Sequence, residues 1–529
     1  MINKDLEMIR SSTSYETLLL FSGEVAEEKI TEPQKLEKLI KDGKYKEKFE
    51  FPLDTEIIKK IQEISIRDSD DDYELFRHLD KISNIWTLLI SKAIKCLRYF
   101  DKREPFMKNE EKSPNSYGID SLSKYYKDYS EFEKTLYGSG KYYRDHVVHV
   151  FRTWLSGVAC LVKNNGAYLD FITVGDKNEN MQTNRCEKLS IWTMVSLMHD
   201  LGYPLEKAQD IISSTRSMIS TFIPNPSISL DLSFRGVQNQ MNDFIVRLMS
   251  SKMVKKDTGI ADKPFVARLQ PKYYFKFQKS LERTKHGIIS TLIIYKLLTY
   301  FLESDYSINE DYSFGEEDCR QFYIRREILR SMASHTCDDI YHLYMDSFSF
   351  LLIIADDTQE WGRKYISELY VDSGKKYILD YISMSTEIAN SYLCEIKEEM
   401  TLPAKKDKND YIEIDEIKSF LYRLKEQCSH YITIFRDGQD TSKRDFVFKK
   451  ICSIDYAPIK MKVIFEINNE QQSLINGEIE YSTQAKVDKL FDGAFFEEAF
   501  KSNKVNWDIE LGKKDEPASW RRGKFSLKV

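Results

Sequence analysis

Apolar residues recur at helical spacing through most of the chain between about residues 140 and 395. In the stretch 147–162, apolar side chains stand three or four positions apart, as on the buried face of a helix. Comparable runs occur at 190–201, 287–302, 325–335 and 345–356. The stretch 215–275 interrupts them with several prolines, and we expect loops and a short helix or two there. The pattern predicts a mainly helical central domain.

The two ends of the chain follow other patterns. Residues 1–135 are mixed and charged, with helical patterning around 78–100. After about residue 403, apolar and polar residues alternate in 460–467, which is typical of a strand, and 430–435 and 445–451 also favour strands. We therefore expect three parts: a mostly helical N-terminal region (1–135), a central domain (136–403) with the insertion at 215–275, and a small α+β domain ending in a basic tail (404–529).

Composition and charge fit a folded protein rather than a fibrous or disordered one. Of the 529 residues 42% are hydrophobic and 13% aromatic, and the formal net charge of −6 gives no general attraction to nucleic acid. The N-terminus carries charges where a signal peptide has an apolar segment, and no apolar run approaches the roughly 20 residues that span a bilayer. These features favour a cytoplasmic protein without a membrane partner. The eight cysteines form no C-x-x-C pair, so we expect small core residues rather than a cysteine zinc site or disulfides.

A polar stripe interrupts the first helix of the central domain. Asp145, His149, Arg152 and Ser156 fall at i, i+4, i+7 and i+11 on a helix that is otherwise apolar around most of its circumference. A buried polar stripe needs partners. For this helix alone, a core histidine satisfied by an ion pair explains the pattern as well as a functional site does.

Further histidines and aspartates stand at the ends of other apolar runs. His199 and Asp200 precede Gly202 and Pro204, which end a helix, and adjacent residues reach one ion only near such an end. Asp356 ends the run 345–356, where an unpaired carboxylate is costly, and Ser349, Asp356, Glu360 and Arg363 share one helical stripe. Two other runs contribute His286 and His335. The result is four histidines and two aspartates on separate helices, a set of side chains that suits Mn, Fe, Co, Ni or Zn better than Ca.

The segments YRDHVVHVFRTWLSG (143–157), SLMHDLGYP (196–204) and ADDTQEWGR (355–363) resemble the HD-domain superfamily of metal-dependent phosphohydrolases. The H…HD…D signature of that family falls on His149, His199, Asp200 and Asp356. The resemblance covers about residues 140–375 and implies a helical HD-domain bundle. His286 and His335 resemble the additional ligands of the binuclear members, among them the HD-GYP phosphodiesterases.

The resemblance also implies roles for these residues. Asp200 would bridge two ions (Mn, Fe, Co, Ni, Mg or Zn) and act in catalysis, while His149, His199 and Asp356 would hold one ion, and His286 and His335 the other. A mononuclear enzyme needs only His149, His199, Asp200 and Asp356. In that case His286 would cap or pack against the turn that follows it, and His335 would bond to Asp338 or Asp339.

Cations and one further histidine lie near these motifs. Arg144 and Arg152 flank His149, and Lys207 follows the His-Asp turn, so all three are candidates for binding substrate phosphates. A solvated or ion-paired surface residue explains each of them equally simply. His146, three positions before His149, is a candidate proton donor or a support for a ligand, and a capping or packing role stays open.

The leading hypothesis is a metal-dependent phosphohydrolase that cleaves a phosphoester or phosphoanhydride of a nucleotide, such as a nucleoside triphosphate or deoxynucleotide, by metal-activated water. The first alternative is an HD-type nuclease acting on single-stranded nucleic acid, for which the basic tail with Trp520 and Phe525 offers charge and stacking. The second is a non-catalytic nucleotide sensor. A homo-oligomer stays open.

Overall fold

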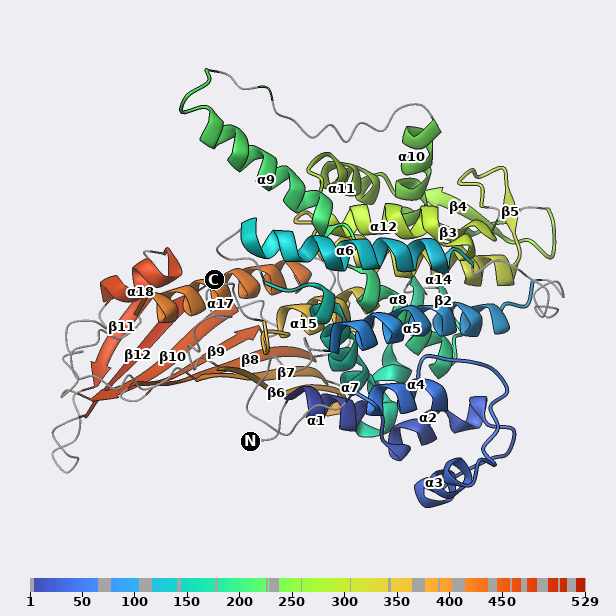
Figure 1. Cartoon of the computed structure of the whole chain (residues 1–529), viewed down its shortest axis with the longest axis horizontal. Coiled ribbons are helices and arrows are strands. Elements are labelled where there is room, and N and C mark those ends of the chain that lie inside the picture. The colour runs from blue at the N-terminus through green and yellow to red at the C-terminus, as the bar shows by residue number, and fades with distance from the viewer. Residues whose placement is uncertain are drawn as a thin grey trace. The chain divides into compact units, whose positions relative to one another are not determined.

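The computed structural model describes most of the chain and divides it into two compact units (Figure 1). The described residues are 4–64, 78–103, 117–139, 144–176, 179–224, 227, 237–257, 259–304, 306–340, 344–363, 376–388, 391–401, 414–435, 445–456, 459–467, 473–482, 493–502, 505–510 and 520–528. The first unit is Met1–Ile340, Met345–Asp356 and Arg363–Ile366, and the second is Tyr341–Tyr344, Asp357–Gly362 and Ser367–Val529.

The first unit is a helical assembly with two small sheets. Its helices are α1 (Lys4–Ser12), α2 (Tyr15–Val25), α3 (Pro33–Lys41), α4 (Thr55–Gln62), α5 (Leu79–Tyr99), α6 (Ile119–Ser139), α7 (Val147–Phe171), α8 (Arg185–Met198), α9 (Tyr203–Ile219), α10 (Val237–Met249), α11 (Pro271–Glu282), α12 (His286–Leu297), α13 (Thr299–Leu302), α14 (Glu316–Ser334) and α15 (Phe348–Asp357). β1 (Val174–Asp176) pairs with β2 (Glu179–Met181), and β4 (Phe265–Leu269) lies between β3 (Ser251–Lys255) and β5 (Ser313–Phe314). The prediction of a mainly helical protein is confirmed.

Helix α8 lies at the centre of the first unit, packed against α5, α7 and α14. Every residue from Cys186 to Met198 is buried, so the helix is covered on all sides. It begins with a capping box between Asn184 and Glu187. Its far end is held by Trp86 of α5, whose indole N–H donates to the Leu197 carbonyl at 2.9 Å. The residues that directly follow α8 are therefore placed by the protein core.

The N-terminal helices belong to this same unit. α5 packs against α8 and α1 packs against α7, so residues 1–135 share the core of the following helices. The expected boundary near residue 135 is thus wrong as a division between compact units. The segment 215–275 also differs from the expectation, because it contains β3 and β4 in addition to helices. α7 itself breaks at 163–166, where Asn164, Asn165 and Gly166 have positive φ.

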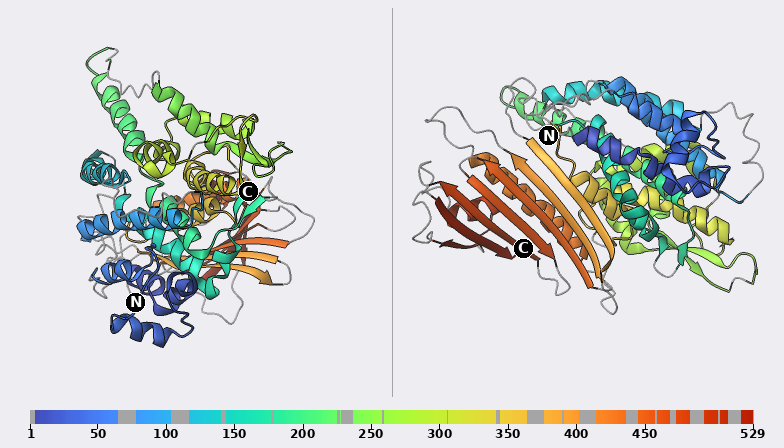
Figure 2. Two further views of the ribbon diagram at one scale, coloured as in Figure 1. Left: turned by 90° about the vertical axis from the view of Figure 1, so that its right-hand side faces the viewer. Right: turned by 90° about the horizontal axis from the view of Figure 1, so that it is seen from below.

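The second unit is built on a seven-stranded sheet in the order β11-β12-β10-β9-β8-β7-β6. β7 and β8 are parallel and the other neighbours are antiparallel. Figure 1 shows the strands side by side in this order, with α17 (Ile414–Phe435) and α18 (Gly493–Phe500) over one face, and Figure 2 shows the same sheet from two further sides. The elements are β6 (Lys376–Ile388), β7 (Ser391–Thr401), α17 (Ile414–Phe435), β8 (Asp445–Tyr456), β9 (Ile459–Ile467), β10 (Ser473–Ser482), α18 (Gly493–Phe500), β11 (Val505–Glu510) and β12 (Trp520–Lys528).

Alternation of side chains explains the sheet. On β9, Met461, Val463 and Phe465 are buried, whereas Lys460 and Lys462 between them are exposed. The buried face carries aromatic rings, and Phe496 of α18 stacks on Phe525 of β12 with 4.3 Å between ring centroids. The strands predicted at 445–451 and 460–467 are confirmed as β8 and β9.

Three expectations for this part of the chain are wrong. Residues 430–435 form the end of α17 rather than a strand. β6 and β7, at 376–401, belong to the same sheet as β8, so the unit does not begin at residue 404 and the helical pattern does not extend to 395. The basic segment near the C-terminus is not a tail, because β12 is an interior strand paired with both β10 and β11.

The described cysteines Cys96, Cys160, Cys186, Cys319, Cys337 and Cys394 are buried and free, as expected for core residues, while the side chains of Cys428 and Cys452 lie outside the described set. Within the described residues, no helix is both long and apolar enough to cross a membrane.

A buried ion pair joins the first helix to α7. Both oxygens of Asp5 accept hydrogen bonds from Arg152, at 2.9 and 2.8 Å, and each side chain is only 1% exposed. Breaking a buried pair from one side leaves the other charge without compensation, so Asp5→Ala should lower the free energy of unfolding by about 3–5 kcal/mol in denaturant titrations. As a control, Glu37→Ala removes the solvent-exposed Glu37–Lys41 pair and should leave the free energy of unfolding almost unchanged. Equal effects of the two variants would contradict a special role for the buried pair.

Candidate metal centre

Six histidine and aspartate side chains from five helix ends meet inside the first unit. His149 lies in the first turn of α7, and His286 begins α12. His199 and His335 directly follow α8 and α14, Asp200 comes next after His199, and Asp356 lies in the last turn of α15. We call these six residues the His/Asp cluster.

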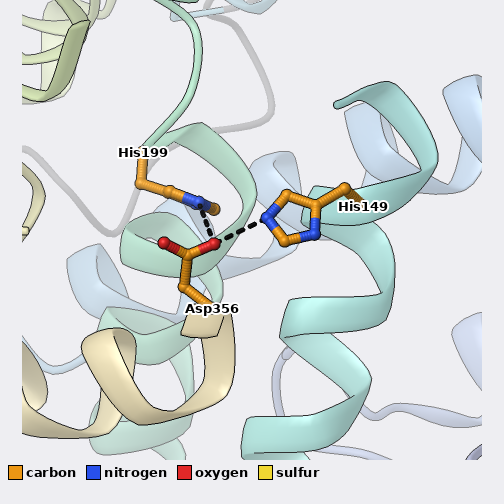
Figure 3. A group of neighbouring side chains, drawn as sticks. All are labelled: His149, His199 and Asp356. Carbon is orange, nitrogen blue, oxygen red and sulfur yellow. Dashed lines mark hydrogen bonds and ion pairs between the residues drawn. The ribbon is translucent and has the colours of Figure 1, made fainter. Parts of the chain in front are cut away.

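His149, His199 and Asp356 form the first group of the cluster (Figure 3). The Asp356 Oδ1 atom lies 2.6 Å from His149 Nε2 and 3.6 Å from His199 Nε2. The two imidazoles are buried and Asp356 is 25% exposed, so the carboxylate is the most accessible member. Both rings point toward the same carboxylate oxygen, as the dashed lines in Figure 3 show.

His286 and His335 form the second group together with Asp200. Their Nε2 atoms lie 3.1 Å apart, and the Asp200 Oδ1 atom lies 3.2 Å from the first and 3.6 Å from the second. Two unprotonated nitrogens at this distance repel each other, so a proton or a cation is needed between them. A metal ion satisfies that requirement as well as a proton does.

Asp200 lies between the two groups. Its Oδ2 atom faces the first group, 3.5 Å from His199 Nε2 and 3.9 Å from His149 Nε2, while its Oδ1 atom faces the second. Ligand atoms about 2.1 Å from one ion stand roughly 3.0–3.5 Å from one another. The separations around Asp200, from 3.2 to 3.9 Å, lie close to those of a coordination shell, and the two oxygens of one carboxylate are divided between two groups.

Hydrogen bonds to the other ring nitrogen orient the imidazoles of His199, His335 and His286. His199 Nδ1 lies 2.8 Å from the Ser196 carbonyl, and His335 Nδ1 lies 2.6 Å from the Met332 carbonyl. Because a carbonyl only accepts, both Nδ1 atoms carry the proton and both Nε2 atoms present a lone pair to the cluster. The buried Nε2 of His199 has no hydrogen-bond partner among the described residues. An orphaned buried lone pair of this kind fits a metal ligand.

Glu206 of α9 performs the same task for His286. Its Oε2 atom lies 2.7 Å from His286 Nδ1 and accepts the His286 backbone N–H at 2.7 Å. A carboxylate behind a histidine fixes the ring and increases the basicity of its free nitrogen. Glu206 therefore directs His286 Nε2 toward Asp200 and His335.

The sequence around the cluster permits close approach of three helices. A Cβ atom on Gly202 would lie 2.4 Å from the His286 carbonyl oxygen, and one on Gly287 would lie 2.5 Å from the Met332 carbonyl oxygen. Ser290 of α12 bridges the same junction, since its hydroxyl donates to the His199 carbonyl at 2.6 Å and accepts the Gly202 N–H at 2.8 Å. These small residues place α12 against the His-Asp turn and against α14.

The cluster strongly favours its carboxylates in the charged form. Burial by itself raises the pKa of Asp200, but its histidine neighbours outweigh burial and hold the pKa well below the usual range. The pKa of Asp356 is likewise held well below its usual range against the effect of burial. Burial would lower the pKa of His286, but Asp200 and Glu206 raise it to about 9. In the metal-free protein a proton on His286 thus balances negative charge that an ion would otherwise balance.

The predicted substrate-binding and proton-transfer residues lie in different places. Arg152 is buried and its guanidinium is bound by both oxygens of Asp5, so the prediction that it binds a substrate phosphate is wrong. Arg144 is half-buried just before α7, and Lys207 lies in the first turns of α9, paired with Asp210 at 2.9 Å. His146 borders the cluster, with its ring centroid 6.1 Å from that of His149.

The two alternatives for the extra histidines do not hold. His335 bonds to the Met332 carbonyl, whereas Asp338 and Asp339 pair with Arg283 and Lys279. His286 contacts Glu206, Asp200 and His335 rather than only packing against the following turn. The structure brings all six predicted ligands together.

Sequence reasoning missed Glu206, Ser290 and Arg363. Glu206 stands six positions after Asp200 and Ser290 four after His286, and spacing along a helix gives a weak signal for each. Arg363 was assigned to a helical stripe with Asp356, but α15 ends at Asp357 and the chain turns there. In the structure the Arg363 Nη2 atom lies 3.5 Å from His146 Nε2.

Comparisons of this chain with protein-family models, with curated proteins and with solved structures found no match.

The raised pKa of His286 makes the stability of the metal-free protein depend on pH. A histidine whose pKa is higher in the folded than in the unfolded protein stabilises the fold by binding a proton. This contribution is complete below the pKa of the unfolded state, about 6.5, and is lost as the pH rises through the pKa of the folded state, about 9. The free energy of unfolding of EDTA-treated protein should therefore fall between these values, by up to about 3 kcal/mol from this group. His286→Gln should flatten the decline, and His78→Gln, outside the cluster, should keep it. An unchanged decline in His286→Gln would contradict the assignment.

Proposed function

We propose that the protein is a metal-dependent phosphohydrolase of the HD-domain type that acts on a nucleotide. The observation that carries the proposal is the division of the two Asp200 oxygens between His149 and His199 on one side and His286 and His335 on the other. A carboxylate placed in this way suits a bridge between two ions, which is the arrangement used by many phosphate-ester hydrolases.

The donor set supports this chemistry. Four imidazoles and two carboxylates suit Mn, Fe, Co, Ni or Zn. His149, His199 and Asp356 would hold one ion and His286 and His335 the other, with Asp200 shared. Bound divalent ions lower the pKa of water and neutralise negative charge on a phosphoryl group. The carbonyls of Ser196 and Met332 and the carboxylate of Glu206 keep three of the imidazoles in the orientation that binding requires.

The cluster favours an enzyme over a sensor that has lost its chemistry. Several buried polar side chains are costly to keep, and each needs a partner. His199 is fully buried, and its Nε2 atom has no hydrogen-bond partner among the described residues; the carboxylates of Asp200 and Asp356 lie near it at 3.5 and 3.6 Å. The proposed ion would bind the Nε2 atom of His199 directly.

The nuclease alternative loses its support from the sequence. The expected basic tail with Trp520 and Phe525 offered charge and stacking for this alternative, but residues 520–528 form an interior strand and Phe525 is buried under Phe496. A nucleotide stays the proposed substrate. The proton-donor role of His146 stays a prediction.

Activity should require divalent metal and the cluster. Wild-type protein loaded with Mn, Co, Ni or Mg should release phosphate or pyrophosphate from nucleoside triphosphates or deoxynucleotides faster than from cyclic dinucleotides or single-stranded DNA and RNA. His199→Ala and Asp200→Ala should lose at least about 100-fold in kcat/KM because an ion ligand is removed. Elemental analysis of the same samples should show the metal lost.

The control is His78→Ala, which removes a histidine at the start of α5 outside the cluster and should keep full activity and metal content. Absence of metal from the wild type, together with full activity of His199→Ala and Asp200→Ala, would contradict the proposed function. Faster cleavage of single-stranded nucleic acid than of any nucleotide would instead favour the nuclease.

A further inference from the structure

The rings of His146 and Tyr203 form a stacked pair beside the His/Asp cluster. Their centroids lie 3.7 Å apart and their planes are inclined by 25°. The His146 centroid is 6.1 Å from that of His149, and the Tyr203 centroid is 5.3 Å from that of His286. The stacked pair therefore borders both groups of the cluster, one through each ring.

One cationic side chain lies near each ring of this stacked pair. The Arg363 Nη2 atom lies 3.5 Å from His146 Nε2, and the Lys207 Nζ atom lies 5.3 Å from the centroid of the Tyr203 ring. Burial raises the pKa of the Tyr203 hydroxyl, and the positive charges of Lys207 and Arg363 both act against that rise. The two cations thus each lie near one ring of the same aromatic pair although they are 156 positions apart in the sequence.

Arg363 is only partly used by the protein. Its Nη2 atom donates to the Asp145 carbonyl at 3.1 Å, and no carboxylate among the described residues forms an ion pair with it. Its buried Nε atom has no hydrogen-bond partner among the described residues. A guanidinium that contacts one carbonyl and one imidazole nitrogen, both through Nη2, keeps its other donors and a full charge available for an anion.

We propose that Arg363 and Lys207, which lie near the two rings of the His146–Tyr203 pair beside the cluster, form an anion subsite that takes a phosphate group of the substrate other than the one being hydrolysed. This inference rests on the proposed function and narrows it: the substrate carries at least two linked phosphate groups. The cluster itself would neutralise the reacting group, so two further cations have no use with a monophosphate.

The two cations suit this task in different ways. The guanidinium of Arg363 is planar and binds two oxygens of a phosphate at once, whereas the Lys207 ammonium acts as a mobile point charge. Asp210 lies 2.9 Å from Lys207, and its carboxylate side chain is 65% exposed. That pair is therefore weak and gives way to a more highly charged ligand.

Inorganic phosphate compounds test the subsite without requiring turnover. Calorimetric titration of the metal-loaded full-length protein with triphosphate, pyrophosphate and orthophosphate gives the affinity for three, two and one phosphate groups. Arg363→Gln should lower the affinity for triphosphate and for pyrophosphate roughly tenfold to hundredfold, because a charge-assisted bidentate contact is lost. The same variant should change the affinity for orthophosphate by less than about twofold, since that ligand binds at the cluster. Lys207→Gln should lower the affinity for triphosphate by about threefold to tenfold.

Two further variants keep the experiment decisive. Arg216→Gln removes an exposed arginine from the same helix as Lys207 and should leave all three affinities unchanged. Arg363→Lys keeps the charge but loses the planar donors, so it should bind triphosphate with an affinity between those of the wild type and Arg363→Gln. Metal content and thermal unfolding, measured on every variant, show that the cluster and fold are intact.

The results separate this inference from the proposed function. Equal affinity of wild type and Arg363→Gln for triphosphate, or an equal loss for orthophosphate and triphosphate, would overturn the subsite. If Arg363→Gln does not fold, Arg363→Lys decides by the same criterion. The protein could bind triphosphate in a way that depends on Arg363 and yet hydrolyse no phosphate compound. That result would support the subsite and overturn the proposed function.

Discussion

The burial of one carboxylate among four imidazoles is the constraint on which the rest of the first unit depends. The Asp200 side chain is 6% exposed, and each of its oxygens faces a different pair of histidines. Removing a carboxylate from water costs several kcal/mol unless opposite charge and hydrogen bonds replace its hydration. The charge that Asp200 needs comes from helices that are distant in the sequence, so the site exists only when five helix ends are in place.

The fold satisfies this constraint through small residues and core anchors. Gly202, Gly287 and Ser290 let α12 approach the His-Asp turn, and the indole of Trp86 holds the end of α8 from a third helix. α8 is buried on all sides, so its end cannot shift without disturbing the core. A position fixed in this way gives a ligand the sub-ångström placement that metal binding requires.

Much of the cluster was predictable because its residues break a strong rule. Histidine and aspartate at the ends of apolar runs are costly, and this is why His149, His199, Asp200, His286, His335 and Asp356 were identified. Arg152 broke the same rule for another reason, and its partner Asp5 lies 147 positions away, which no local pattern reveals. Buried charge is visible in the local pattern of residues, but the partner that neutralises it is not.

The sheet was harder to predict. Residues 430–435 favour a strand by composition yet continue α17, because tertiary packing overrides local propensity. β6 and β7 were read as part of a helical region, since short apolar segments fit both periods. The pairing of β7 with β8 spans the whole of α17, and such long-range pairing leaves no trace in neighbouring residues. The position of Arg363 was not predictable for a related reason. α15 ends at Asp357, and the helical spacing between Asp356 and Arg363 does not reveal that end.

The measurement that tests the central claim most directly is the anomalous scattering of manganese in crystals of the full-length protein. Two peaks about 3.5–4 Å apart are expected, as in two-metal hydrolases, with one Asp200 oxygen directed to each peak. One should lie among His149, His199 and Asp356, and the other beside His286 and His335. A single peak, with His286 and His335 still bonded to each other, would contradict a shared Asp200.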